Sequence, residues 1–207
     1  MHRDKGETRK RILAAVGKVL TQSGMAEIGI NSIARQAGVD KVLIYRYFGS
    51  LEELLETYAE ESSFWPDSAE LLGDQAGLKR PGGAREALSL MLVGQLNEIR
   101  RRKATQEILR WEVMEANVLT DYLKDNRDKQ TSEILGGLSM AEKSSKDLEA
   151  LVALINAGIT HLVLLSKTSD KHLGIDLHSN FGWQRLSKLI RELVNGYLNA
   201  PDDNVRK

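Results

Sequence analysis

The side chains best suited to chemistry fall between residues 41 and 47, where the sequence reads KVLIYRY. If this stretch is a helix, Ile44 faces the protein core together with Phe48, which lies four residues later. The outward side then carries Lys41, Val42, Leu43, Tyr45, Arg46 and Tyr47. Such a face suits the major groove of DNA, because lysine and arginine bond guanine, aliphatic groups contact thymine methyls, and tyrosine hydroxyls bond phosphates.

The residues before this stretch predict a second helix and a tight turn that would hold it in place. Apolar side chains recur at helical spacing over 30–37, and Gly38 permits the left-handed backbone of a turn. Asp40 can cap the next helix, and Val39 with Ile44 can form a hydrophobic staple. The pattern predicts a helix-turn-helix whose second helix is exposed. The alternative is a helical hairpin with a purely structural role in a bundle.

The rest of the chain predicts an all-α protein, because apolar residues recur at spacings of three and four and no two-residue alternation stands out. A first helix is expected over about Glu7–Ser23, ended by Gly24 in a left-handed cap. Ser50 and Glu53 form a capping box for a helix running towards Phe64 and Trp65. Further helices are expected near 84–103, 104–117, 120–136, 146–168 and 180–198, about nine in all. Loops are expected at 73–83, 136–145 and 169–179.

The charge is divided unevenly along the chain, although 29 basic and 29 acidic residues give a net charge of zero. Residues 1–50 hold nine basic and four acidic side chains, a net charge of +5, so the remainder carries −5. A basic head suggests a polyanionic partner. The absence of cysteine excludes disulfide scaffolds and thiolate zinc sites, and it fits a reducing cytoplasm.

At Ile33-Ala34, Ala37-Gly38-Val39, Tyr45, Phe48 and Glu53-Leu54 the chain resembles the tetracycline-repressor (TetR) family of bacterial transcriptional regulators. The resemblance covers roughly residues 7–55. It implies a three-helix DNA-binding domain over 1–50 and a helical effector-binding and dimerisation domain over 51–207. It also implies that residues 41–43, 45 and 46 face the groove, that Asn31 reaches a base, and that Tyr45 and Tyr47 hold phosphates.

Three residues depart from the family pattern. Leu51 stands where the family usually has a phosphate-binding lysine, which removes one charged contact with DNA. Gly29 replaces the usual threonine or serine cap, and Asp40 replaces a common serine. Basic residues of the first helix are expected to offset these losses, namely Arg9, Lys10 and Arg11.

The two apolar helices at the end of the chain are candidates for a dimer interface. The resemblance implies a homodimer with a four-helix interface, whose two recognition helices would read a near-palindromic operator. The side chains expected there are Leu151, Ile155, Leu162, Trp183, Leu186, Ile190 and Leu193. An intramolecular core would explain the same pattern.

The resemblance also implies a small-molecule pocket in the middle of the C-terminal domain. Its candidate lining consists of polar or aromatic residues on otherwise apolar faces, which would suit an apolar or aromatic effector. These are Trp65, Met91, Trp111, Met114, Tyr122, Asn156 and His161. Each of them can equally be an ordinary core residue.

Enzymatic, metal and membrane interpretations find little support. The histidines lack zinc-ligand spacing, and no phosphate loop is present, so we expect no enzyme, no metal and no cofactor. The uncharged stretch Leu151–Ser166 is shorter than a membrane span of roughly 20 residues, and a core or interface helix explains it better. We therefore expect a cytoplasmic, ligand-responsive DNA-binding repressor. The alternative is an all-helical small-molecule-binding protein or enzyme whose N-terminal hairpin is only structural.

Overall fold

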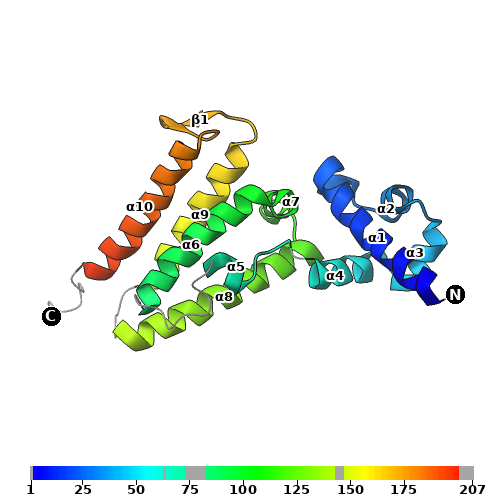
Figure 1. Ribbon diagram of the computed structural model, residues 1–207, viewed down its shortest axis with the longest axis horizontal. Helices are drawn as coiled ribbons and strands as arrows, with labels where there is room; N and C mark the ends of the chain where they lie inside the picture. Colours follow the sequence, from blue (N-terminus) through cyan, green and yellow to red (C-terminus); the bar gives the residue numbers. More distant parts are fainter. Residues whose placement is uncertain (1, 63, 73–82, 143–146, 201–207) are drawn as a thin grey trace. The chain divides into compact units, whose positions relative to one another are not determined.

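The computed structural model describes residues 2–62, 64–72, 83–142 and 147–200, and most of them are helical (Figure 1). Contacts between residues divide the chain into two compact units. The first unit comprises residues 1–65 and 102–125, and the second comprises residues 66–101 and 126–207. This division reflects packing, and the expected division of roles between 1–50 and 51–207 stays a prediction.

The first unit is built around helix α1, which packs against α2, α4 and α7. Its core consists of apolar side chains at helical spacing, including the fully buried Ile12, Ile33, Ile44 and Leu54. The unit contains α1 (His2–Ser23), the 3₁₀ helix η1 (Met25–Glu27), α2 (Ile30–Ala37), α3 (Lys41–Phe48), α4 (Leu51–Glu61), α7 (Lys103–Glu112) and the start of α8 (Val118–Glu142).

The second unit is built around helix α6, which packs against α5, α9 and α10. Leu88, Met91, Leu92 and Leu96 of α6 are buried in its core. The unit contains α5 (Ser68–Leu72), α6 (Gly83–Arg101), the rest of α8, α9 (Leu148–Leu165), the short strands β1 (Lys171–His172) and β2 (Ile175–Asp176), and α10 (Asn180–Asn199).

The all-α prediction is confirmed, and the predicted bounds of α2 and α3 match the structure. Asp40 and Ser50 cap their helices, accepting hydrogen bonds from the backbone N–H groups of Val42 at 2.8 Å and Glu53 at 3.1 Å. Gly24 has the expected positive φ of 88°, but its ψ of 171° is extended, so the left-handed helical cap predicted there was wrong.

Several predicted helix ends were wrong. Helix α1 begins at His2 and not at Glu7, and α7 ends at Glu112, five residues before its predicted end. Helix α4 stops at Glu61 before it reaches Trp65, and Pro66 disfavours helical backbone at the residue that precedes it. Helix α8 runs through Gly136 to Glu142, because an exposed glycine costs a helix only about 1 kcal/mol. The remainder of the loop expected over 136–145 lies outside the described residues.

Three small elements were not predicted, and the first of them is the 3₁₀ helix η1. Asp67 and Glu70 cap α5 reciprocally, each carboxylate accepting a hydrogen bond from the other residue's backbone N–H. Strands β1 and β2 form a hairpin through Leu173 and Gly174, which both have positive φ. The usual sequence signal for such a two-residue turn is Asn-Gly or Asp-Gly, so the dipeptide Leu-Gly did not indicate a hairpin.

Candidate nucleic-acid interface

The turn between α2 and α3 is fixed by its own backbone. Gly38 adopts the left-handed conformation (φ 63°, ψ 42°), and its N–H donates to the carbonyl of Arg35. The N–H of Val39 donates to the carbonyl of Ala34, which completes the helix-ending motif. Arg11 of α1 donates from Nη2 to the carbonyls of Ala37 and Gly38 at 2.8 and 3.1 Å. Helix α1 therefore holds the turn that aims α3.

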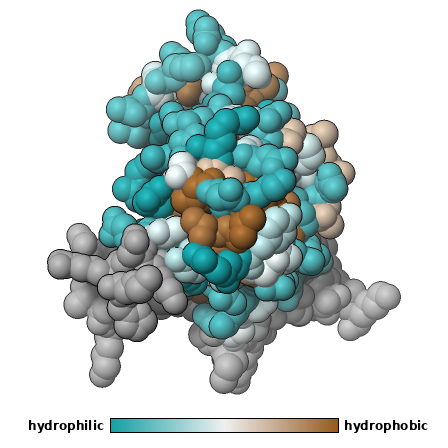
Figure 2. Space-filling view, turned by 90° about the vertical axis from the view of Figure 1, so that its right-hand side faces the viewer, coloured by the Kyte–Doolittle hydropathy of each residue, from teal (hydrophilic) through white to brown (hydrophobic). Residues whose placement is uncertain are grey.

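The exposure pattern predicted for α3 is confirmed. Ile44 is fully buried and Phe48 is 6% exposed, whereas Val42 is 63% and Tyr45 51% exposed. The guanidinium of Arg9 lies over the Phe48 ring, 5.5 Å from its centre. Figure 2 views the protein from the side that carries α1–α3 in Figure 1, and the described surface there is mostly hydrophilic, with its largest hydrophobic area near the centre of the view.

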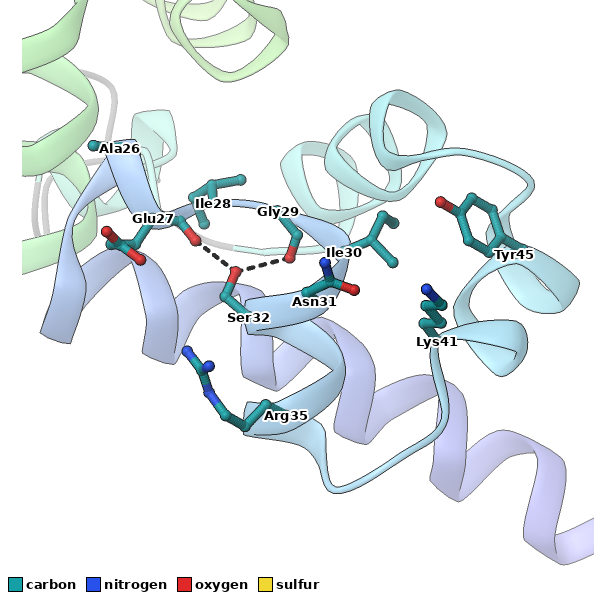
Figure 3. Close-up of a pocket in the computed structure, with 10 residues that line it drawn as sticks. All are labelled: Ala26, Glu27, Ile28, Gly29, Ile30, Asn31, Ser32, Arg35, Lys41 and Tyr45. Carbon is teal, nitrogen blue, oxygen red and sulfur yellow. Dashed lines mark hydrogen bonds between the residues drawn. The ribbon is translucent and has the colours of Figure 1, made fainter.

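The exposed side of α3 borders a surface hollow of about 460 Å³ at the start of α2. Figure 3 shows Lys41 and Tyr45 on the α3 side of this hollow and Asn31, Ser32 and Arg35 on the α2 side. The hydroxyl of Ser32 points toward the segment that precedes α2 and donates to the carbonyls of Glu27 and Gly29 (Figure 3). The cationic groups of Lys41 and Arg35 make the hollow suitable for an anion, although Glu27 also lines it.

The first turn of α2 adds backbone donors to this hollow. Gly29 stands at the capping position and supplies no side-chain acceptor for the first amide groups of the helix. Such amide groups carry partial positive charge and can bind a phosphate. The departure of Gly29 from the family pattern therefore leaves the start of α2 open to an external acceptor.

The predicted DNA-contacting residues fall into three groups. Asn31, Lys41 and Tyr45 meet in the hollow, whereas Val42 and Arg46 are exposed outside its lining. Leu43 and Tyr47 are half-buried, and the Arg46 guanidinium lies 5.6 Å from the centre of the Tyr47 ring.

One cation of the hollow, Arg35, was missed in the sequence. Its signal was its position four residues after Asn31, because residues at this spacing share one face of a helix.

The basic residues of α1 contribute less free charge than expected. Arg9 forms an ion pair with Glu61 at 2.5 Å, and the hydrogen bond from Arg9 lowers the pKa of Glu61.

The candidate effector-binding residues are spread over both units. In the first unit, Trp111 donates from Nε1 to Glu107 at 3.2 Å, Met114 is 70% exposed, and Tyr122 packs on Phe64 with ring centres 5.7 Å apart. In the second unit, Asn156 is half-buried, and His161 is exposed beside His172. The buried Trp65 and Met91 also belong to different units.

Most of the candidate dimer residues are buried in the core of the chain itself. Ile155, Trp183, Leu186 and Ile190 are each at most 9% exposed, since α9 and α10 pack on α6. Leu151 and Leu162 are half-buried, and Leu193 is 46% exposed. The indole N–H of Trp183 donates to the carbonyl of Leu177 at 2.7 Å. The apolar side chains that stay exposed on these two helices include Leu154, Phe181 and Leu189.

Asp40 provides a test of how the turn is stabilised. Replacing Asp40 with alanine removes the cap of α3 and is expected to cost about 1 kcal/mol of folding stability. Asp40→Asn retains an oxygen acceptor, so it should lose only a few tenths of this value. Urea unfolding of both variants measures the difference. Equal losses in the two variants would show that the charge of Asp40, and not its hydrogen bond, stabilises the helix.

Comparisons with known proteins agree with this geometry. Residues 12–58 match the sequence model of bacterial regulatory proteins of the tetR family. An uncharacterized HTH-type transcriptional regulator of Mycobacterium tuberculosis is 42% identical over 53 residues, 26% of this chain and 26% of that protein. The chain thus matches about a quarter of the length of this relative.

Two solved structures share the fold over most of the chain. A TetR-like transcriptional regulator from Rhodococcus sp. RHA1 superposes with a TM-score of 0.59 at 21% identity, covering 93% of this chain and 97% of that one. The transcriptional regulator FadR from Bacillus subtilis, in complex with stearoyl-CoA, superposes with a TM-score of 0.62 at 20% identity, covering 89% and 96%. At these identities the two structures support the architecture only.

Proposed function

We propose that this chain belongs to the tetR family of bacterial regulatory proteins. On this premise, we infer that it is a ligand-responsive repressor in the cytoplasm, which binds a near-palindromic DNA operator as a homodimer. The observation that carries the proposal is the exposed side of α3 beside the basic hollow. Polar, cationic and aliphatic groups project there from a helix whose other side is buried.

The groups around the hollow suggest a division of roles on DNA. Exposed Val42 and Arg46 suit base edges in the major groove, where aliphatic groups meet thymine methyls and arginine bonds guanine. Lys41, Tyr45 and the first amides of α2 suit a backbone phosphate, because all of them supply hydrogen-bond donors. The phosphate would fix the register in which α3 lies along the groove.

The proposal is tested by a mobility-shift titration with the DNA that flanks the protein's own gene. A specific shift is expected at low salt, and the affinity should fall steeply as salt rises, because bound phosphates release counterions. Unrelated DNA of equal length serves as the control. The absence of any shift at low salt, or an affinity independent of salt, contradicts the proposal.

The homodimer is proposed to form through the exposed sides of α9 and α10. Helix α9 is long and apolar enough to cross a membrane, and only 28% of it is buried within the chain. Leu154 on α9 is 75% exposed, and Leu189 and Leu193 on α10 are 48% and 46% exposed. A Cβ atom at Gly158 or Gly196 would meet nothing within 4 Å. A partner helix could therefore approach closely and cover these leucines.

Leu189→Asp combined with Leu193→Asp is expected to convert the dimer to a monomer. Two buried charges in each subunit would have to lose their hydration in a symmetric interface, at a cost of several kcal/mol. Analytical ultracentrifugation measures the change in mass. Leu173→Asp is the matched control, because Leu173 is 90% exposed on the β-hairpin and should leave the dimer intact. A double variant that stays dimeric places the interface elsewhere.

The effector is proposed to be a small molecule with an apolar or aromatic body, which releases the protein from DNA by favouring a conformation with lower operator affinity. The stearoyl-CoA bound to FadR supports an apolar ligand in this fold. Candidate contacts remain those predicted from the sequence, with Trp111, Met114 and Tyr122 in one unit and Asn156 and His161 in the other.

A further inference from the structure

A second surface hollow lies within the second unit, between the first turns of α6 and the second half of α10. Figure 1 shows these two helices. Its volume is about 340 Å³, and it is lined by Arg85, Glu86, Ser89 and Leu90 of α6 and by Arg191 and Asn195 of α10. Nothing in the DNA-binding or dimer proposals uses these side chains. Two arginines facing one hollow require a physical explanation, because like charges repel.

Three of the lining residues carry hydrogen-bond donors with no partner among the described residues. The side chains of Arg191 and Asn195 form no hydrogen bond or ion pair within that part of the chain. The hydroxyl of Ser89 is buried without a partner, and its residue is only 5% exposed. Leaving a buried hydroxyl unpaired costs about 1–3 kcal/mol. A ligand that accepts a hydrogen bond from Ser89 would remove this cost.

The position of the hollow on α6 adds to its preference for an anion. Helix α6 begins at Gly83, so Arg85 and Ser89 lie in its first two turns, near the positive end of the helix dipole. Arg85 also donates to the side-chain oxygen of Asn199, which fixes its guanidinium at the edge of the hollow. Glu86 opposes an anion, and it is the single carboxylate among the lining residues.

The hollow stays open if the protein dimerises as proposed. Arg191 and Asn195 lie four residues apart on one side of α10, and Leu189 and Leu193 lie four apart on another side. The two pairs are offset by two residues, which is about 200° around a helix. A partner helix on the leucines would therefore not cover the arginine side of α10.

We propose that this hollow binds the oxyanion group of a small molecule, either a carboxylate or a phosphate. Arg191 supplies a planar pair of N–H donors that matches the spacing of two oxygen atoms of such a group. Asn195 and Ser89 supply further donors, and the start of α6 stabilises the negative charge. The site goes beyond the proposed DNA binding and does not depend on it.

The experiment is a calorimetric titration of the full chain, without DNA, with sodium phosphate and separately with sodium acetate. Sodium chloride at matched ionic strength controls for screening. Phosphate, acetate or both should bind, and the stronger of the two identifies the group. Arg191→Gln should weaken binding about 10- to 100-fold, because it removes hydrogen bonds from a charged donor. Lys188→Gln, which removes the same charge from the same helix outside the hollow, should change affinity by less than threefold.

Two further variants separate a binding role from a structural one. Glu86→Gln should tighten binding, since it removes the carboxylate that opposes the anion. Ser89→Ala should weaken binding while leaving the melting temperature of the anion-free protein unchanged or raised, because an unpaired buried hydroxyl is lost. Binding of neither anion by the wild type, or equal weakening by Arg191→Gln and Lys188→Gln, overturns the proposal.

Discussion

Lys41→Ala combined with Tyr45→Ala is expected to lower operator affinity by at least about 100-fold. Both side chains project into the hollow beside α2, and Tyr45 is 51% exposed. A hydrogen bond to a charged group such as phosphate contributes about 1.5–3 kcal/mol, and a symmetric dimer loses each contact twice. Fluorescence anisotropy with labelled operator DNA measures the affinity. The lost lysine contact should also reduce the salt dependence by about one phosphate per subunit.

The matched control for this variant is Lys103→Ala at the start of α7. Lys103 is an exposed lysine of the same unit that lies outside the lining of the hollow. It should change affinity by less than threefold, and thermal unfolding should show that both proteins are folded. If Lys103→Ala weakens binding as much as the double variant does, the general charge of the unit and not the side of α3 determines affinity.

Gly94→Ala is expected to destabilise the protein by about 3 kcal/mol, a large loss for one added methyl group. A Cβ atom at Gly94 would lie 2.8 Å from the carbonyl carbon of Leu71 and 3.0 Å from its Cα. These are backbone atoms of α5, which packs closely on α6 and cannot move aside as a flexible side chain would. Thermal unfolding should show a decrease of roughly 6–12 °C in Tm.

Gly136→Ala is the control for this substitution. Gly136 also lies within a helix, α8, but a Cβ atom there would meet nothing within 4 Å. Alanine is the better helix former, so this change should stabilise the protein by about 0.5–1 kcal/mol. Opposite signs for the two substitutions are therefore expected. A neutral Gly94→Ala would mean that α5 is not packed on α6 as described.

The helix-turn-helix could be predicted in detail because its signals are local. The position after α2 has a left-handed backbone conformation, which favours glycine, and Gly38 occupies it. The first backbone amides of α3 need a hydrogen-bond acceptor, and Asp40 supplies it. The burial of Ile44 and Phe48 follows from their spacing of four residues in a helix. Each of these requirements falls on residues within a few positions of one another, so the sequence alone was sufficient.

The capping of α5 and the β-hairpin were also local, yet they were missed. The Asp67–Glu70 capping box spans four residues and could have been recognised from its spacing. The Leu173-Gly174 turn could not, because leucine disfavours the positive φ that it adopts there.

What the sequence determined by itself is the all-helical class, the basic first quarter and the exposed side of α3. What only the tertiary structure decided is how apolar helices share their surfaces. The spacing of Trp183, Leu186 and Ile190 marks an apolar side of α10, but it does not say whether α6 or a second subunit covers that side. In the structure α6 covers that side, which leaves Leu189 and Leu193 exposed.

Gly94 is a second case that only the tertiary structure decided. No side chain fits at this position, because the backbone of Leu71 on another helix lies against it. The hydrophobic effect is not directional, so an apolar pattern predicts that a surface will be buried but not which partner buries it. The tertiary structure decides whether that partner is another helix of the chain or a second subunit.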